Sequence, residues 1–431
     1  MDRLSLGYLS LIVAAYMIGL SNLWKFPALL LKYGLGGLLF YIVIVITMIP
    51  LIAVAMESTK HKRHELLEYY YEEYGKPGLG LTFFVFDVVL LSYYALVGGW
   101  PLTALAIKDV TSSFSGNVLT LVIVFVVLLL VLMHGKERTF DIMVISVALA
   151  FISFLTAIFL LYIKIGQYNT GDMFLKWLGE AFAWKGISAS MIRDMSQQAA
   201  YSLSLGMGFY LVLGEFLPNR ISSTKLATIG ALLDTTASIL GTILISMVLA
   251  FSPDVPIHGT ALVFKGLPQV LKAVNASPVL YLLYFTLFLI ALSSMIPLGE
   301  TIIRVFEELS RRPRQTAAPI ILASTFVLGI ASVAVMIYGG VDTIGILDGA
   351  VTTFVLFGGI IAAWAVITGK EYIPSSLRRA SYLGVLIVGT LGIYALIQLI
   401  LGKNFASLVL LLMLLGVALG FNGYLKGLLS E

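Results

Sequence analysis

The sequence predicts an all-α polytopic membrane protein with twelve transmembrane helices. Of its 431 residues, 59% are hydrophobic and only 12% are charged, which is more apolar surface than a soluble domain could bury. Apolar segments of about 20 residues, the length needed to cross a bilayer, recur along the whole chain. These segments span residues 5–30, 35–58, 79–107, 117–134, 140–165, 190–217, 223–251, 278–306, 315–338, 343–368, 380–401 and 405–426.

Charge and composition set the topology and exclude several classes of protein. Most of the 27 Lys and Arg residues fall in short loops on the side of the N-terminus. The positive-inside rule therefore predicts a multi-pass protein of the cell (plasma) membrane with both termini in the cytoplasm. The net charge of +4 follows from these loops and indicates no nucleic-acid partner. There is no cysteine for a disulfide, and no span carries a GxSxG, HExxH or paired-acid motif that would indicate an enzyme.

Two connecting segments are longer than simple turns. Residues 61–74, HKRHELLEYYYEEY, are helix-prone and charged, which predicts a surface helix on the cytoplasmic side. Residues 252–278 are rich in Pro, Gly and Asn around an amphipathic middle, which predicts an external loop with short helices above a vestibule. Neither segment is typical of a soluble domain, so residues 1–431 are predicted to form a single transmembrane domain.

The first span is interrupted at its centre. Within residues 11–27, LIVAAYMIGLSNLWKFP, Gly19 is a poor helix former, and Ser21 and Asn22 compete for backbone hydrogen bonds. Unpaired backbone carbonyls are tolerated in hydrocarbon only where they line a cavity or are buried in protein. The break therefore predicts a binding site near the middle of the bilayer. The alternative is that Gly and Ser simply mark close helix packing.

The sixth span contains a second interruption of the same kind. Residues 202–208, SLSLGMG, place two serines and two glycines within seven positions, which weakens a helix in mid-membrane. Breaks at matched positions in spans one and six favour a binding site, because a transporter that binds its substrate at the midplane uses paired broken helices.

Several spaced motifs resemble those of one transporter family. Residues 19–27, GLSNLWKFP, resemble the GLGNxWRFP motif of the neurotransmitter:sodium symporters, whose bacterial amino-acid transporters include LeuT. Further similar motifs follow in the same order, namely Tyr93-Tyr94, SLSLGMG at 202–208, DTTASIL at 234–240, ALSS at 291–294 and Glu300. The resemblance implies a LeuT-type fold with two inverted five-helix repeats, broken helices 1 and 6, and two further spans. The repeats would be residues 1–168 and 187–368, with spans 11 and 12 in residues 379–428.

The resemblance also implies two sites for Na+, a hard cation that prefers oxygen ligands. Sodium 1 would be held by Met17, Asn22, Ser202 and Asp234, together with a carboxylate oxygen of the substrate. Sodium 2 would lie between the carbonyls of Ala15, Ile18 and Ile290 and the hydroxyls of Ser293 and Ser294. The residues alone leave one alternative open, since adjacent serines can bond back to the preceding helical turn.

Asp234 is an acid within a span, where an ionised side chain is costly and indicates a functional site with a cationic partner. Its own span has no Lys or Arg nearer than Lys225, so Na+ is the better partner. Eukaryotic members of the family have neutral Asn and Ser here and use chloride to balance charge. With a fixed carboxylate at Asp234 and a hydroxyl one turn on at Ser238, the resemblance implies chloride-independent transport.

The residues that match the family's substrate site indicate an amino acid. Monoamine carriers have an Asp where this chain has Gly19, and without it an amine lacking a carboxylate has no counter-charge. The absence of formal charge in the matching side-chain pocket implies a neutral, apolar or aromatic side chain. The implied substrate-binding residues are Gly19, Leu20, Ser21, Leu90, Tyr94, Tyr201, Ser202, Ser204, Met207, Ser294 and Leu298.

Gates are implied at both ends of the transport pathway. Lys25 matches the family's outer Arg and Asp348 its acidic partner, with Tyr201 as an aromatic lid. A Lys cannot make the bidentate contact of an Arg, so this gate would be looser. On the cytoplasmic side, Arg3 would pair with Glu307 or Glu308.

The predicted function is a sodium-coupled symporter of a neutral amino acid that works by alternating access. Asp87 and Glu300 fit no part of this scheme, and either is a candidate proton site. A proton-coupled or uncoupled amino-acid or amine carrier of the same fold, or a transport-like sensor, therefore stays an open alternative. The expected partners are the substrate, Na+ and the lipid bilayer, with the protein as a monomer or homodimer.

Overall fold

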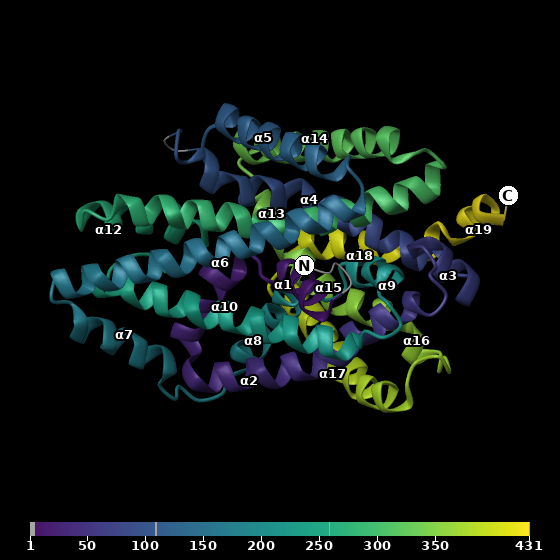
Figure 1. Cartoon of the computed structure of the whole chain (residues 1–431), viewed down its shortest axis with the longest axis horizontal. Coiled ribbons are helices and arrows are strands. Elements are labelled where there is room, and N and C mark those ends of the chain that lie inside the picture. Colours follow the sequence, from purple (N-terminus) through teal and green to yellow (C-terminus); the bar gives the residue numbers. More distant parts are fainter. Residues whose placement is uncertain (1–4, 108–109, 258, 431) are drawn as a thin grey trace.

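The computed structural model describes residues 5–107, 110–257 and 259–430, and these form helices joined by short connections (Figure 1). The all-α class is confirmed. The helices are α1 (Leu6–Met17), α2 (Ser21–Lys60), α3 (Leu66–Tyr74), α4 (Pro77–Thr103), α5 (Phe114–Leu132), α6 (Lys136–Gln167), α7 (Gly171–Phe182), α8 (Ala189–Ser202), α9 (Phe209–Phe216), α10 (Ser223–Phe251), α11 (Gly259–Ala261), the π-helical turn η1 (Leu262–Gly266), α12 (Leu267–Ala273), α13 (Ser277–Ser310), α14 (Arg314–Gly339), α15 (Thr343–Ala362), α16 (Trp364–Ile367), α17 (Ser375–Leu401), α18 (Phe405–Gly420) and α19 (Asn422–Ser430).

Ten stretches of helix in the described chain are long and apolar enough to cross a membrane. They account for every predicted span except the first and the sixth. The first is divided between α1 and the start of α2, and the sixth between α8 and α9, so that α1, α8 and α9 are each too short to qualify. Twelve crossings stay a prediction, and the two that length does not identify are the two predicted to be broken.

The first two predicted spans are joined without a gap in helix, because α2 contains the outer part of the first span and all of the second. The chain turns within α2 at Gly34, whose φ of 65° lies in the left-handed region. A Cβ there would lie 1.9 Å from the carbonyl oxygen of Ala183, so only Gly fits this turn. The next amide, that of Leu35, donates to the same carbonyl at 2.9 Å.

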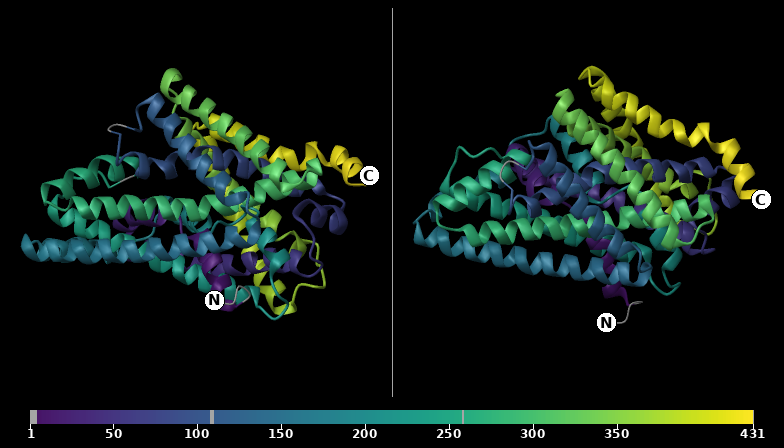
Figure 2. Two further views of the ribbon diagram at one scale, coloured as in Figure 1. Left: turned by 45° about the horizontal axis from the view of Figure 1, so that its top comes forward. Right: turned by 90° about the horizontal axis from the view of Figure 1, so that it is seen from above.

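The bundle has a buried centre and an apolar periphery. α1 lies near the centre of Figure 1 and packs against α6, α10 and α13. In the right-hand view of Figure 2, α6 runs along one edge of the bundle and α18 with α19 along the opposite edge. Large apolar side chains are exposed on these outer helices, for example Phe159 on α6 and Met413 and Leu419 on α18. Such a surface suits a lipid environment and would be unstable in water.

The break of the sixth span packs directly on α15. Gly206 has a φ of 71°, and a Cβ added there would lie 2.3 Å from the amide nitrogen of Gly359. A Cβ on Gly358 would in turn lie 2.5 Å from the carbonyl oxygen of Gly206. The backbones of the two segments therefore touch, and glycine at these positions permits the contact.

The predicted connecting helices are present, with different bounds. The surface helix predicted over residues 61–74 begins only at Leu66, after a turn at residues 61–63, because Glu65 and Glu68 cap its first turn. Four of its nine residues are buried, so it is seated on the bundle. The external loop contains α11, η1 and α12 as expected, whereas α7 (Gly171–Phe182) was not predicted.

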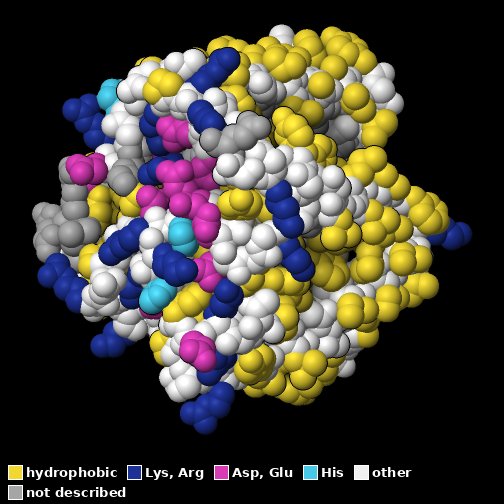
Figure 3. All heavy atoms as spheres, turned by 90° about the vertical axis from the view of Figure 1, so that its right-hand side faces the viewer, with side chains coloured by type: hydrophobic (Ala, Val, Ile, Leu, Met, Phe, Trp, Pro, Cys, Tyr) yellow, Lys and Arg dark blue, Asp and Glu magenta, His cyan; other side chains and the backbone are white. Residues whose placement is uncertain are grey.

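The end of the bundle that carries α3 is strongly charged, and Figure 3 shows acidic side chains gathered between Lys and Arg there. Glu308, one of the two acids predicted to pair with Arg3, instead accepts hydrogen bonds from three amides at the start of α3. Glu307 lies 3.9 Å from Arg314. Arg3 itself lies outside the described residues, so the predicted inner gate stays a prediction.

At the same end of the bundle, the carboxylate of Glu73 forms two ion pairs, with Lys62 at 2.6 Å and with Lys370 at 2.7 Å.

Replacing Gly206 with Ala should lower the midpoint of thermal denaturation of the purified protein in detergent. A left-handed conformation costs an L-residue about 1–2 kcal/mol, and the forced separation from α15 adds about 1–3 kcal/mol. The control is Gly416→Ala, at an exposed position of α18 where an added Cβ meets nothing within 4 Å. Equal midpoints for the two variants would contradict this account of the contact.

The ion pairs of Glu73 should make part of the stability depend on pH. Burial raises the pKa of this carboxyl, but hydrogen bonds and charge from Lys370 and Lys62 outweigh it and lower the pKa below its usual 4.5. The stabilisation is therefore complete above about pH 4.5 and is lost as pH falls through the folded-state pKa. Thermal denaturation of wild type and Glu73→Gln across this range should show a difference in midpoint that shrinks in acid. A difference in midpoint that does not change with pH would contradict a stabilising contribution from the ion pairs of Glu73.

Candidate functional site

The five residues predicted to form the second sodium site lie together between α1 and α13. The hydroxyl of Ser293 donates to the carbonyls of Ala15 at 3.1 Å and Ile290 at 2.9 Å. The hydroxyl of Ser294 donates to the carbonyls of Ile18 at 3.1 Å and Ile290 at 3.2 Å. Interhelical contacts and back-bonding to the preceding turn thus occur at the same two serines. The result is five oxygen atoms from two helices, a donor set that suits a hard cation.

The break in the sixth span places one more hydroxyl, that of Ser204, against the break in the first span. α8 ends in a Schellman motif, in which Ser204 adopts a φ of 51° and the amide of Leu205 donates to the carbonyl of Ala200 at 2.9 Å. This conformation is unusual for a residue other than Gly. It lets the Ser204 hydroxyl donate to the carbonyl of Tyr16 at 2.8 Å, another carbonyl at the broken end of α1.

Three of the four residues predicted for the first sodium site form a buried cluster. The side-chain Nδ2 of Asn22 donates to the Asp234 carboxylate at 2.7 Å and to the hydroxyl of Ser238 at 2.8 Å. Ser202 donates to both carboxylate oxygens, at 2.9 and 2.8 Å. Tyr41 donates to the same carboxylate at 3.1 Å and was not predicted. All three donors to the carboxylate, Asn22, Ser202 and Tyr41, are neutral, so within this cluster the Asp234 charge has no cationic partner.

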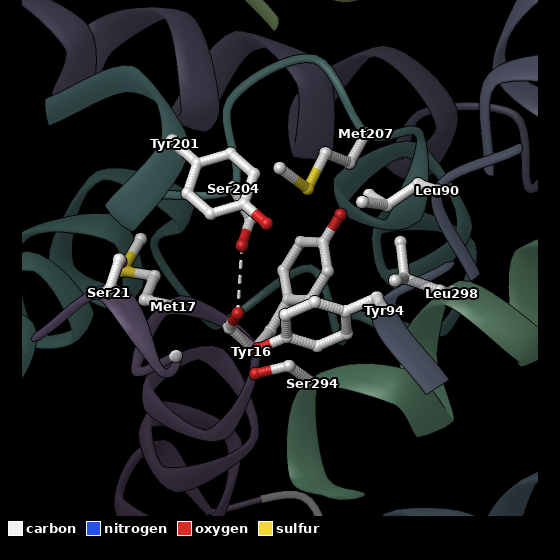
Figure 4. Close-up of a pocket in the computed structure, with 11 residues that line it drawn as sticks. Tyr16, Met17, Ser21, Leu90, Tyr94, Tyr201, Ser204, Met207, Ser294 and Leu298 are labelled. Carbon is white, nitrogen blue, oxygen red and sulfur yellow. Dashed lines mark hydrogen bonds between the residues drawn. The ribbon is translucent and has the colours of Figure 1, made fainter. Parts of the chain in front are cut away.

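A cavity lies between the two breaks (Figure 4). Nine of the eleven predicted substrate-binding residues line it, together with Met17, the fourth predicted ligand of the first sodium, and Tyr16, which was not predicted. The two predicted residues outside the lining are Ser202, which belongs to the Asp234 cluster, and Leu20, whose amide faces the Tyr94 hydroxyl at 3.5 Å. The lining residues are Tyr16, Met17, Gly19, Ser21, Leu90, Tyr94, Tyr201, Ser204, Met207, Ser294 and Leu298.

A second, wider cavity adjoins the first, and Ser21, Tyr94 and Tyr201 line both. The predicted gate pair borders this outer cavity, with Lys25 Nζ 3.6 Å from Asp348 Oδ2 and 5.9 Å from the ring centre of Tyr201. The two charged side chains are 34% and 45% exposed, so water screens the pair and its contribution is small. The three predicted gate residues are thus in contact at one end of the inner cavity.

The two acids without a predicted role have different surroundings. Glu300 is fully buried and forms a bidentate pair with Arg314, and Arg304 also lies 3.4 Å from it. Two Arg side chains therefore satisfy the buried Glu300 carboxylate. Asp87 is equally buried, but neither of its carboxylate oxygens has a hydrogen-bond partner in the described chain.

Two residues near the sites escaped prediction from the sequence. Tyr41 is in the second span, outside every matched motif, and Tyr16 precedes the GLSNLWKFP motif by three positions. Both are tyrosines in otherwise aliphatic stretches of a span, and that isolated polar group is the signal that could have found them.

Comparison with known proteins gives the family and the fold of the chain. A family model described as the sodium:neurotransmitter symporter family matches residues 106–375. A curated protein of Haemophilus influenzae described as an uncharacterized sodium-dependent transporter is 24% identical over 355 residues, which are 74% of this chain and 76% of that protein. A crystal structure of MhsT in complex with L-phenylalanine is similar with a TM-score of 0.71 at 21% identity, covers 95% of this chain and 98% of its own, and confirms the LeuT-type fold. Since the family match spans more than half of the residues, the chain belongs to the sodium:neurotransmitter symporter family.

Proposed function

We propose that the protein is a symporter that couples Na+ to the uptake of a neutral, apolar or aromatic amino acid by alternating access. Family membership makes it a multi-pass sodium-coupled transporter rather than an enzyme. The observation that carries the proposal is the cavity between two broken spans, which has oxygen clusters suited to Na+ on two sides. The walls of the cavity contain aromatic, aliphatic and hydroxyl side chains and no charged residue.

The substrate is proposed to bind with its carboxylate at the start of α2. The amides of Leu20 and Ser21 are at the positive end of this half-helix, and the Tyr94 hydroxyl lies 3.5 Å from the first of them. One carboxylate oxygen would complete the sodium site at Asn22 and Asp234. Binding of the substrate and of this Na+ would then depend on each other, which is how one gradient can drive the other.

Chloride independence is supported by the surroundings of Asp234. Its carboxylate is fixed by Ser202, Asn22 and Tyr41, so a negative charge is already present where chloride would supply one. A second anion in this buried cluster would be repelled. We therefore propose that transport needs Na+ but not chloride.

Gating and topology complete the proposal. The outer gate would be the pair of Lys25 and Asp348 with Tyr201, because the pair borders the outer cavity and Tyr201 lines both cavities. The repeats at residues 1–168 and 187–368 would move against each other around the fixed site. The strongly basic loops at the α3 end favour placing both termini in the cytoplasm of a plasma-membrane protein.

Binding of neutral amino acids should require Na+. Replacing Ser293 or Ser294 with Ala should lower the affinity of the protein for that Na+. Each change removes one of five oxygens from the second cluster, so the Na+ concentration for half-maximal substrate binding should rise roughly 10-fold or more. The measurement is binding of a panel of neutral amino acids to purified protein with Na+, K+ or choline as the only cation.

The matched control for the serine variants is Thr325→Val in α14. Its buried hydroxyl bonds only locally, to the Ile321 carbonyl at 2.9 Å, so its loss should leave the Na+ dependence unchanged. Equal substrate binding in all three cations would contradict sodium coupling and favour a proton-coupled or uncoupled carrier.

Replacing Asp234 with Asn should make transport depend on chloride. The substitution preserves the shape of the side chain but removes the fixed charge, which an external anion could then replace. Uptake into liposomes in chloride and in gluconate should differ for the variant and agree for wild type. A wild-type protein that already needs chloride would refute the proposal.

A further inference from the structure

Two buried polar side chains close to the inner cavity have no hydrogen-bond partner in the described chain. Neither carboxylate oxygen of Asp87, on α4, makes a hydrogen bond, and its residue is 0% exposed. The hydroxyl of Tyr16, on α1, is also unpaired, and its residue is 1% exposed. The sodium clusters use neither side chain, and no matched motif contains them.

The two groups belong to the same end of the cavity. Tyr16 lines the cavity, and in Figure 4 its ring extends away from Ser294 until its hydroxyl lies beside Leu90 and Met207. Asp87 precedes Leu90 by three residues and therefore lies on the same face of α4, one turn farther along. The Tyr16 hydroxyl thus gives the cavity a polar end, and Asp87 lies one helical turn from the cavity-lining Leu90.

Unpaired polar groups at this depth are costly. Burying a polar group without a hydrogen bond lowers the stability of the fold by about 1–3 kcal/mol, and burying an unpaired ionised carboxylate lowers it by more. The neighbours of Asp87 on its own face of α4 cannot relieve this, because the residues three and four positions away, Phe83, Phe84, Leu90 and Leu91, are all apolar. Acids within a span that lack a protein partner commonly meet a ligand, an ion or a proton. Here Tyr16 and Leu90 line the cavity between the two broken spans, and Asp87 lies one helical turn from Leu90.

We propose that Tyr16 and Asp87 form a subsite that recognises a hydrogen-bond donor at the tip of the substrate's side chain. This inference rests on the proposed function and narrows its substrate class to a neutral amino acid with an aromatic body and a donor tip, such as a phenol or an indole N–H. Leu90, Met207 and Leu298 suit the apolar body of such a side chain. A cationic tip fits less well, because an ammonium would lose its hydration among these apolar walls.

The first test compares L-tyrosine, L-phenylalanine and L-lysine as ligands of the purified wild-type protein in Na+. Tyrosine should bind about 10- to 100-fold more tightly than phenylalanine, since only the phenol satisfies the unpaired groups. Equal binding of the two, or tighter binding of phenylalanine, would overturn the inference. Lysine as the tightest ligand would overturn the assignment of a neutral substrate.

Two variants locate the preference at the subsite. Asp87→Leu and Tyr16→Phe should each reduce the preference for tyrosine to about 3-fold or less while phenylalanine still binds. The control is Ser92→Ala on the same helix, whose buried hydroxyl donates locally to the Val89 carbonyl at 2.7 Å and should leave the preference intact. A preference that survives in both variants would place recognition elsewhere.

The outcomes separate this inference from the proposed function. If Asp87→Leu does not elute as a folded protein in size-exclusion chromatography, Tyr16→Phe and the wild-type comparison still decide the matter. Absence of sodium-dependent binding for every neutral amino acid would contradict the proposed function itself. Sodium-dependent binding of phenylalanine and tyrosine with equal affinity would contradict only the subsite.

Discussion

Satisfying the backbone oxygens released at the break in the first span is the constraint on which the site depends. Hydrocarbon offers these carbonyls no partner, so the protein must supply donors or a cation. Three hydroxyls from two other spans do so, those of Ser204, Ser293 and Ser294. This requirement fixes α8 and α13 against α1, and the cavity is the space that remains between them.

Sequence could identify the breaks because their causes are local. Gly19 and Gly206 weaken a helix wherever they occur, and Asp234 is costly in any span, so these positions stand out without knowledge of the fold. Their partners could not be found in that way. Tyr41 meets Asp234 across 193 positions of sequence, and Tyr16 lines the cavity with residues of α4 and α13 that lie far from it in the sequence. Such contacts follow from packing, which a single sequence does not display.

The two cavities are separated by a layer only one side chain thick. Ser21, Tyr94 and Tyr201 each border both spaces. Ser21 stands where the GLGNxWRFP motif has Gly, and its buried hydroxyl has no partner in the described chain. The positions at which this chain departs from that motif, Ser21 and Lys25, therefore lie in or beside this layer.

The serine hydroxyls between α1 and α13 have a consequence for turnover. Each hydroxyl donates a hydrogen bond to a carbonyl of the broken helix, at 3.1 Å in both cases. If these oxygens bind a cation as proposed, each hydroxyl would have to turn its hydrogen away and offer a lone pair, so that one satisfied arrangement would be exchanged for another. The net free energy of binding would then be small compared with filling a set of bare oxygens. Such a site would release its cation readily when the cation concentration falls, and the proposed carrier could reset after each cycle.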